Sequence, residues 1–362
     1  MEEIIKRKKI NVAVFFGGES VEHEVSIQSA KNIINELKNK NEINLIPIFV
    51  DKEGKWHNVE SDIENIKKIG EVSYNFSKKE LQLNGKKAEI DIAFSLIHGN
   101  IGEDGKIQGL FEIMNVAYTG SDLTSSAIAM NKKLSKILAA REGVPVLDDM
   151  IVTKNNFLKN KQEILKKIKK IKLPIFVKPV SLGSSVGVSK VSKQGEMEKA
   201  ILNAFKYEDT IMVEKGIERA REIVCGILGS QDDMKTSPCG EIRIKGKHEF
   251  YDYSAKYIDN NAMELDIPAN IDIKTHEKIQ EYSKKVFKSI GCYGFARVDF
   301  LMDLKNGKIY FCEINTIPGF TSHSLFPKLW QKAGVNLKEQ LKQISLLAIE
   351  RQKIKSKFKK TI

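Results

Sequence analysis

Cysteine, proline and tryptophan are scarce in this sequence of 362 residues, and long apolar runs are missing. The four cysteines, at positions 225, 239, 292 and 312, include no Cys-x-x-Cys pair, which argues against a disulfide framework and against a zinc site. No apolar run approaches the length of a membrane span. The first apolar run ends at Gly17-Gly18, too short for a signal-peptide core and without a small-residue cleavage site. These absences predict a protein of the reducing cytoplasm.

The composition is that of a globular protein, with 41% hydrophobic and 29% charged residues, and the length allows two or three domains. The formal net charge is +12, with basic residues near the N-terminus, over 159–172 and in the tail after Arg351. One interpretation is a nucleic-acid-binding protein. The other is a lysine-rich surface that attracts anionic substrates. The excess is mostly lysine, not the mixture of arginine and aromatic residues that reads bases, so we favour the second.

Two patterns follow each other along the chain. Over about the first 120 residues, strand-like and helix-like segments alternate, which predicts a parallel α/β sheet. A single helix is expected over 124–141, ended by Gly143 and Pro145, followed by a lysine-rich helix. The other expected elements are strands over 11–16, 45–50, 90–97, 174–178, 186–191 and 210–215, and helices over 25–37, 275–290 and from 325 onward.

Two short motifs flank an Asn-Gly turn signal: Arg297-Val-Asp299 and Glu313-Ile-Asn315. A two-residue loop would place the two carboxylates on opposite faces of the hairpin, because one residue of slip inverts a strand. A three-residue loop, 305–307 with Gly307 left-handed, would pair Asp299 with Glu313 and Arg297 with Asn315. All four groups would then share one face and suit a magnesium-bound polyphosphate. The alternative is ordinary surface charge.

A Gly/Ser-rich turn joins two further strands, in Lys178-Pro-Val-Ser-Leu-Gly183-Ser184-Ser185-Val-Gly187. Glycine and hydroxyl side chains let donors approach phosphate oxygens, and Lys178 adds a positive charge. The lysine precedes the glycines and no helix follows, so this is not the loop of P-loop enzymes. A plain hairpin with a mobile tip is the alternative.

Two places could hold the ends of a small substrate, and a third segment could cover them. Glu22 follows the first strand, where open α/β sheets bind ligands, and His98 ends another strand of that sheet. Thr321–Leu325 opens a helix whose N–H groups could bind a carboxylate, although Ser322 or Ser324 could simply be its N-cap. The polar segment 248–270 has poor periodicity and many aromatic residues, as expected of a lid loop.

Together these segments resemble the D-alanine–D-alanine ligase family, from Gly17-Gly18 to Leu325 and in the expected order. The resemblance implies an α/β protein with an α+β C-terminal part. Its fold would be ATP-grasp, preceded by a parallel-sheet α/β domain. The implied divisions are an N-terminal domain over 1–124, a central domain over 125–222 and a C-terminal domain over 223–362. The last would contain the lid loop 248–270 and the metal site.

The resemblance also implies ATP and two Mg²⁺ ions, for which Mn²⁺ substitutes. Lys132 and Lys178 would contact the nucleotide phosphates, and Lys256 of the lid would reach the transferred phosphate. The segment that holds adenine and ribose would consist of Glu214, Lys215, Ile217 and Glu222. The metal ligands would be Asp299, Glu313 and Asn315.

Two D-alanine molecules are the implied substrates. Glu22 would orient the first, supported by His98, while Ser184 and Tyr257 would link the phosphate loop and the lid to Glu22. The family forms an acyl phosphate from ATP and the first D-alanine, which the second then attacks to give the dipeptide used in peptidoglycan synthesis. A homodimer is the family's expected assembly.

The second substrate would be held where that attack occurs. Arg297 and the Gly319 N–H would stabilise the oxyanion, and Ser324 with the Leu325 N–H would bind the second carboxylate. Related ligases accept D-serine or D-lactate instead, but Tyr257 after Lys256 resembles the D-alanine type. Another ATP-grasp carboxylate–amine ligase and the nucleic-acid-binding protein remain as alternatives.

Overall fold

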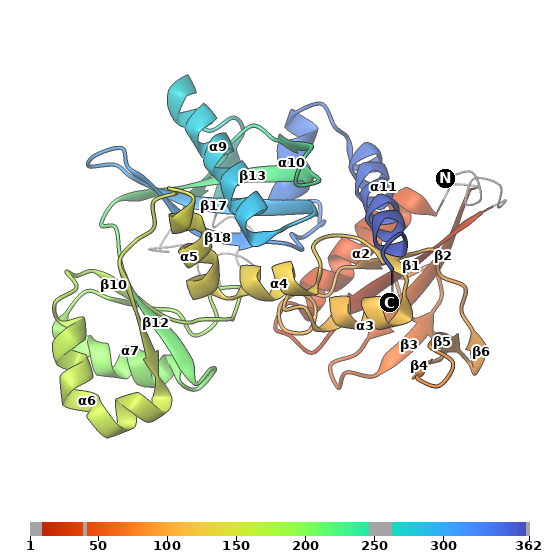
Figure 1. Ribbon diagram of the computed structural model, residues 1–362, viewed down its shortest axis with the longest axis horizontal. Helices are drawn as coiled ribbons and strands as arrows, with labels where there is room; N and C mark the ends of the chain where they lie inside the picture. Colours follow the sequence, from red (N-terminus) through yellow and green to blue (C-terminus); the bar gives the residue numbers. More distant parts are fainter. Residues whose placement is uncertain (1–8, 39–41, 246–262, 360–362) are drawn as a thin grey trace.

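The computed structural model describes residues 9–38, 42–245 and 263–359. Within them the chain forms three sheets with flanking helices, in lobes that follow one another along the sequence (Figure 1). Lys256 and Tyr257 lie outside the described residues. No helix in the described ranges is long and apolar enough to span a membrane.

The first sheet has the strand order β6-β5-β4-β3-β2-β1-β7-β8. Strands β1, β2 and β7 pair in parallel as predicted, and the short strand β8, which was not predicted, pairs in parallel with β7. Strands β3 to β6 form an antiparallel meander, which was not predicted either. Short turns join these strands and leave no room for a crossover helix. The bounds are β1 (Ile10–Gly17), β2 (Ile43–Val50), β3 (Trp56–Val59), β4 (Lys68–Asn75), β5 (Glu80–Leu83), β6 (Lys86–Lys87), β7 (Ile92–Ser95) and β8 (Ala117–Tyr118).

Helix α2 (His23–Leu37) buries one face against this sheet, because Ile27, Ala30 and Ile34 recur at helical spacing. Helix α3 (Lys106–Met114) follows β7. The predicted helix over 124–141 is two helices, α4 (Leu123–Met130) and α5 (Lys132–Arg141). Asn131 between them is extended, and its side chain accepts the N–H groups of Lys133 and Leu134. The chain therefore breaks to cap α5.

The second sheet is antiparallel, in the order β11-β10-β12-β9. Helices α6 (Lys154–Ile168) and α7 (Met197–Ala204) supply buried residues to its core. A short 3-10 helix, η1 (Gln194–Glu196), precedes α7. The strands are β9 (Asp149–Thr153), β10 (Ile175–Pro179), β11 (Ser189–Val191) and β12 (Thr210–Lys215).

The third sheet runs β16-β15-β13-β17-β18, with β14 paired to β13. Its strands are β13 (Ala220–Gly229), β14 (Met234–Thr236), β15 (Gly240–Ile244), β16 (Met263–Asp266), β17 (Gly294–Asp303) and β18 (Ile309–Asn315). The segment 248–270 was predicted as a lid loop, but its residues Met263–Asp266 form a strand, β16, which pairs with β15. The helices are α9 (Ile273–Ile290), α10 (Leu325–Lys332) and α11 (Leu337–Ser356).

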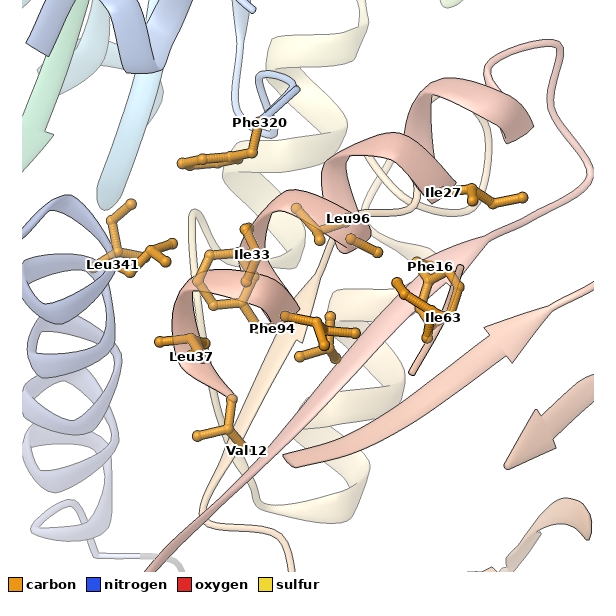
Figure 2. Close-up of a cluster of buried hydrophobic side chains, with 14 of the residues drawn as sticks. Val12, Phe16, Ile27, Ile33, Leu37, Ile63, Phe94, Leu96, Phe320 and Leu341 are labelled. Atoms are coloured by element: carbon orange, nitrogen blue, oxygen red, sulfur yellow. The ribbon is translucent and has the colours of Figure 1, made fainter. Parts of the chain in front are cut away.

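One hydrophobic core joins the first lobe to the last. Phe94 and Ile33 of the first sheet and its helix share a cluster with Phe320 and Leu341, which lie more than 200 residues later. Figure 2 shows these side chains between α2 and α11. This packing holds the segment after β18 against α2. The two predicted substrate-binding places, at Glu22 and at Thr321–Leu325, are thereby brought together.

Candidate functional site

The hairpin of β17 and β18 has the predicted pairing. Asp299 lies opposite Glu313, and Arg297 lies opposite Asn315. Buried and part-buried residues alternate along β17, so Arg297 and Asp299 point away from the core. Gly307 in the loop is left-handed as predicted, with φ of 69°. The four polar side chains therefore share one face of the sheet.

The predicted loop length is wrong. The loop spans the four residues 304–307, since the Asp303 N–H donates to the Lys308 carbonyl at 2.9 Å. Continued regularly, that loop would pair Asp299 with Cys312 and turn Glu313 inward. A β-bulge at Cys312 adds one residue to β18 and restores the pairing.

The bulge has a reason in the sequence of β18. Ile309 and Phe311 are two residues apart and both are buried in the core. Ile314, the next buried residue, is three residues further on. A regular strand would turn Ile314 toward the polar face, whereas one extra residue keeps all three inside. This change of spacing is the signal that would have predicted the bulge.

Oxygen atoms dominate the polar face of the hairpin. Both carboxylate oxygens of Asp299 accept from the Arg297 guanidinium at 2.8 Å. Asn315 Oδ1 accepts a backbone N–H at 2.9 Å, and Glu313 Oε2 lies 3.8 Å from Lys132 Nζ. Two carboxylates and an amide are hard donors that fit a divalent cation. No three His, Cys, Asp or Glu side chains within the described ranges form a metal-binding cluster, so ligand oxygens would have to complete the shell.

The Gly/Ser segment between β10 and β11 is strained. Ser184 and Ser185 are both left-handed, with φ of 53° and 57°, which is rare for residues other than glycine. Such strain is concentrated at ligand-binding sites. A Cβ added at Gly183 would lie 3.8 Å from Glu22 Oε2, so this loop lies close to the first predicted substrate contact. Lys132 donates to a carbonyl of the same loop at 2.5 Å.

Three buried charged residues, Lys136, Lys178 and Glu214, form a cluster. Glu214 Oε2 is 2.6 Å from Lys178 Nζ, and Glu214 Oε1 is 2.5 Å from Lys136 Nζ. Burial raises the pKa of Glu214, but the two ammonium groups outweigh it and lower the pKa to about 2. Burial lowers the pKa of Lys178, but the Glu214 carboxylate outweighs it and raises the pKa above its ordinary value. Glu214 and Lys178 therefore form a buried pair of opposite charges.

The first substrate corner contains Glu22, His98 and Glu103, all buried. His98 Nδ1 lies 3.6 Å from Glu103 Oε1. Burial lowers the pKa of His98, but the Glu103 and Glu22 carboxylates outweigh it and raise the pKa. Burial and the Glu22 charge raise the pKa of Glu103. This cluster of acidic groups around an imidazole suits an ammonium ligand beside a carboxylate.

The second corner lies at the start of α10. Ser324 occupies the N-cap position, but its side chain makes no capping hydrogen bond. Its Oγ instead accepts the Thr321 N–H at 2.9 Å. A Cβ at Gly319 would lie 2.7 Å from Ser324 Oγ, so any larger residue there would displace this hydroxyl. The start of α10 is thus not capped by Ser324, and the N–H groups of Leu325 and Phe326 suit an anion.

One cavity of about 1020 Å³ connects both corners with the hairpin. It is lined by ten of the predicted site residues: Glu22, His98, Lys132, Ser184, Arg297, Glu313, Asn315, Gly319, Ser324 and Leu325. Within the described ranges, six others lie outside its wall: Lys178, Glu214, Lys215, Ile217, Glu222 and Asp299.

Two buried residues of this region were not predicted. Glu103 follows His98 by five positions in a Gly-Glu-Asp-Gly segment, a glycine-flanked carboxylate that could have been noticed. Lys136 follows Lys132 by four positions and so lies on the same face of α5. The first spacing could have indicated Glu103, and the second could have indicated Lys136.

Comparison with known families separates the remaining interpretations. Residues 11–121 match the family model described as D-ala D-ala ligase N-terminus, and residues 138–345 match that described as D-ala D-ala ligase C-terminus. This chain belongs to the D-alanine–D-alanine ligase family. Of the ligase residues predicted above, only Lys132 falls between the two matched ranges.

Relatives and solved structures of the ligase family match nearly the whole chain. D-alanine–D-alanine ligase B of Clostridium tetani is 41% identical over 343 residues, 94% of this chain and 94% of that protein. The VanG D-Ala:D-Ser ligase of Enterococcus faecalis has a TM-score of 0.83 at 33% identity, covering 94% of this chain and 99% of that one. The D-alanine–D-alanine ligase of Coxiella burnetii has a TM-score of 0.82 at 33% identity, covering 97% of each. The fold is the ATP-grasp fold of these ligases, as predicted.

Proposed function

We propose that this protein joins two D-alanine molecules to D-alanyl-D-alanine, with ATP converted to ADP and phosphate, for peptidoglycan precursor synthesis. The cavity carries the proposal. Its oxygen-donor face, formed by the β17–β18 hairpin, lies between a corner suited to an amino acid ammonium and a corner suited to a carboxylate. The family membership supports the same reaction.

ATP would be bound between the second and third sheets. Lys132 and Lys178 would contact its phosphates, and the segment of Glu214, Lys215, Ile217 and Glu222 would hold adenine and ribose. Mg²⁺ or Mn²⁺, when bound by Asp299, Glu313 and Asn315, would neutralise phosphate charge. The donor chemistry of these three side chains supports the assignment.

The first D-alanine would lie against Glu22, which attracts its ammonium group. His98, which lines the same cavity, would support Glu22 in orienting this substrate. That carboxylate would attack the γ-phosphorus and give an acyl phosphate. Ser184, close to Glu22 in the strained loop, would donate toward this region.

The second D-alanine would be held by its carboxylate at Ser324 and the Leu325 N–H. Its amine would attack the acyl phosphate carbonyl, and the developing oxyanion would be stabilised by Arg297 and the Gly319 N–H. Water would hydrolyse the acyl phosphate, so the site has to be closed during the reaction. Lys256 and Tyr257, outside the described residues, remain the predicted contacts of the lid.

The three domains of the sequence prediction, 1–124, 125–222 and 223–362, remain part of the proposal. They are supported by the separation of the three sheets along the chain. We also propose a cytoplasmic homodimer, as the family resemblance implies. Light scattering would test the dimer.

The test is ADP release by the purified protein with D-alanine, L-alanine, D-alanine plus D-serine, and D-alanine plus D-lactate, with product analysis by mass spectrometry. We expect turnover with D-alanine alone and none with L-alanine. A mixed product formed in preference to D-alanyl-D-alanine would identify a different second substrate. Retention on DNA without ATP turnover would identify the nucleic-acid-binding alternative.

A further inference from the structure

Lys136 is among the most deeply buried charged residues of the described chain, with 1% of its surface exposed. It lies on α5, one turn after Lys132, and its Nζ donates to the Phe311 carbonyl of β18 at 3.1 Å. The same Nζ lies 2.5 Å from Glu214 Oε1 on β12. Lys136 therefore connects the second sheet to the third, at the strand that carries Glu313.

Glu214 is shared between two lysines. Its other oxygen, Oε2, is 2.6 Å from Lys178 Nζ. Both carboxylate oxygens of Glu214 therefore lie in ion pairs, and the three groups carry a formal net charge of +1. Removing one partner from a buried ion group leaves an uncompensated charge, whereas neutralising both partners is often tolerated.

We propose that Lys136 is a positioning residue for nucleotide binding: it neutralises Glu214 and thereby leaves the charge of Lys178 available to the ATP phosphates. Lys136 itself touches no substrate. Without it, Glu214 would have Lys178 as its sole cationic partner within this triad, and the positive charge offered to the phosphates would fall. The proposal rests on the function proposed above, because it assumes that Lys178 contacts ATP.

The experiment measures KM for ATP and for D-alanine in four proteins: wild type, Lys136→Met, the double variant Lys136→Met/Glu214→Gln, and Lys133→Met. Lys133 is the matched control, since it lies on the same helix and loses a 2.6 Å ion pair, with Asp149, that does not involve Glu214. Circular dichroism and thermal melting check that each variant is folded.

We expect Lys136→Met to raise KM for ATP by roughly tenfold while KM for D-alanine changes by less than about twofold. The double variant should have a lower KM for ATP than Lys136→Met, because the neutral amide introduced by Glu214→Gln no longer competes for the charge of Lys178. Lys133→Met should behave as wild type. This order of KM values would not follow from a purely structural role, which predicts that the double variant is equally or more impaired.

Two results would overturn the inference: an unchanged KM for ATP in Lys136→Met, or a double variant as poor as the single one. If Lys136→Met does not fold, Lys136→Gln decides, because its side chain is also uncharged but can still donate to the Phe311 carbonyl. A several-fold rise in KM for ATP alone would support the inference, and equal rises for both substrates would contradict it. If the wild type itself shows no D-alanine-dependent turnover, the proposed function fails, which is a distinct result.

Discussion

At the scale of single residues, most charges of the site are compensated by a neighbour at contact distance. Arg297 is paired with Asp299, and Glu214 with two lysines. A lone buried charge would be costly, so each member of a pair stabilises the other in its buried position. This fixes the side chains before any ligand arrives, which favours catalysis because little reorganisation remains.

Glu313→Gln tests the oxygen-donor face. The amide retains the size of the side chain but removes the negative charge, so we expect kcat to fall by more than about 100-fold. The melting temperature should change little, because Glu313 is part-exposed. Glu281→Gln is the control, since that carboxylate is 62% exposed and pairs only with Lys285 on α9 within the described contacts. Near-normal turnover in Glu313→Gln would remove the metal assignment.

Glu214 makes stability depend on pH. Its folded-state pKa of about 2 lies below the ordinary 4.5, so its stabilising contribution is complete above pH 4.5 and is lost as the pH falls toward 2. Urea unfolding at several pH values should show a steeper loss of free energy of unfolding in this range for wild type than for Glu214→Gln. Parallel curves for the two proteins would show that this carboxylate has no such linkage.

At the scale of elements, the β-bulge of β18 decides what the hairpin can do. The loop and the bulge each shift the register, and only their combination places Asp299 beside Glu313 with Ile309, Phe311 and Ile314 inside. Bulges are frequent next to active sites, where they redirect a side chain. The polar face is thus a property of the whole hairpin.

One inserted alanine after Phe311 should therefore reduce kcat by about 100-fold or more, because it displaces Glu313 from the polar face. One glycine inserted after Gly307 lengthens an exposed loop, and we expect kcat within about threefold of wild type. Steady-state kinetics of both insertions checks this. Equal losses in the two variants would contradict the role of the bulge.

How far the sequence predicts this structure depends on how local the signal is. Strand β12 and the start of α10 were predicted at their observed limits, since the apolar run of β12 and the Thr-Ser-His-Ser segment before α10 are both local sequence signals. The break at Asn131 was missed because apolar spacing continues across it. The face of the hairpin that carries Asp299 and Glu313 was predicted correctly, although the loop length was wrong. The extra loop residue and the β-bulge each shift the register by one, so together they give the same pairing as a hairpin with neither.

At the scale of the whole molecule, helix α11 belongs to the third lobe and packs against the first. Arg351 of this helix is buried and donates to the carbonyls of Tyr118 and Gly120, at 2.7 Å for Tyr118. Its guanidinium lies 4.1 Å from the centre of the Tyr118 ring. The hydrophobic core around Phe320 joins the same two lobes (Figure 2).

Arg351→Met should lower the free energy of unfolding by about 2–3 kcal/mol, because two carbonyls lose a charged donor and a cation–π contact is lost. Arg351→Lys should be intermediate, as a lysine keeps the charge with fewer donors. Calorimetry or urea unfolding measures both. A methionine variant as stable as wild type would mean that α11 is held by apolar packing alone.

The central claim is that this chain activates the carboxylate of one D-alanine as an acyl phosphate and transfers it to a second. Oxygen-18 in the carboxylate of D-alanine tests it most directly, with mass spectrometry of the inorganic phosphate and of the dipeptide. The account predicts ADP, D-alanyl-D-alanine and phosphate in equal amounts, with a single labelled oxygen carried from the substrate into each phosphate. Dipeptide formed with unlabelled phosphate, or with AMP in place of ADP, would contradict it.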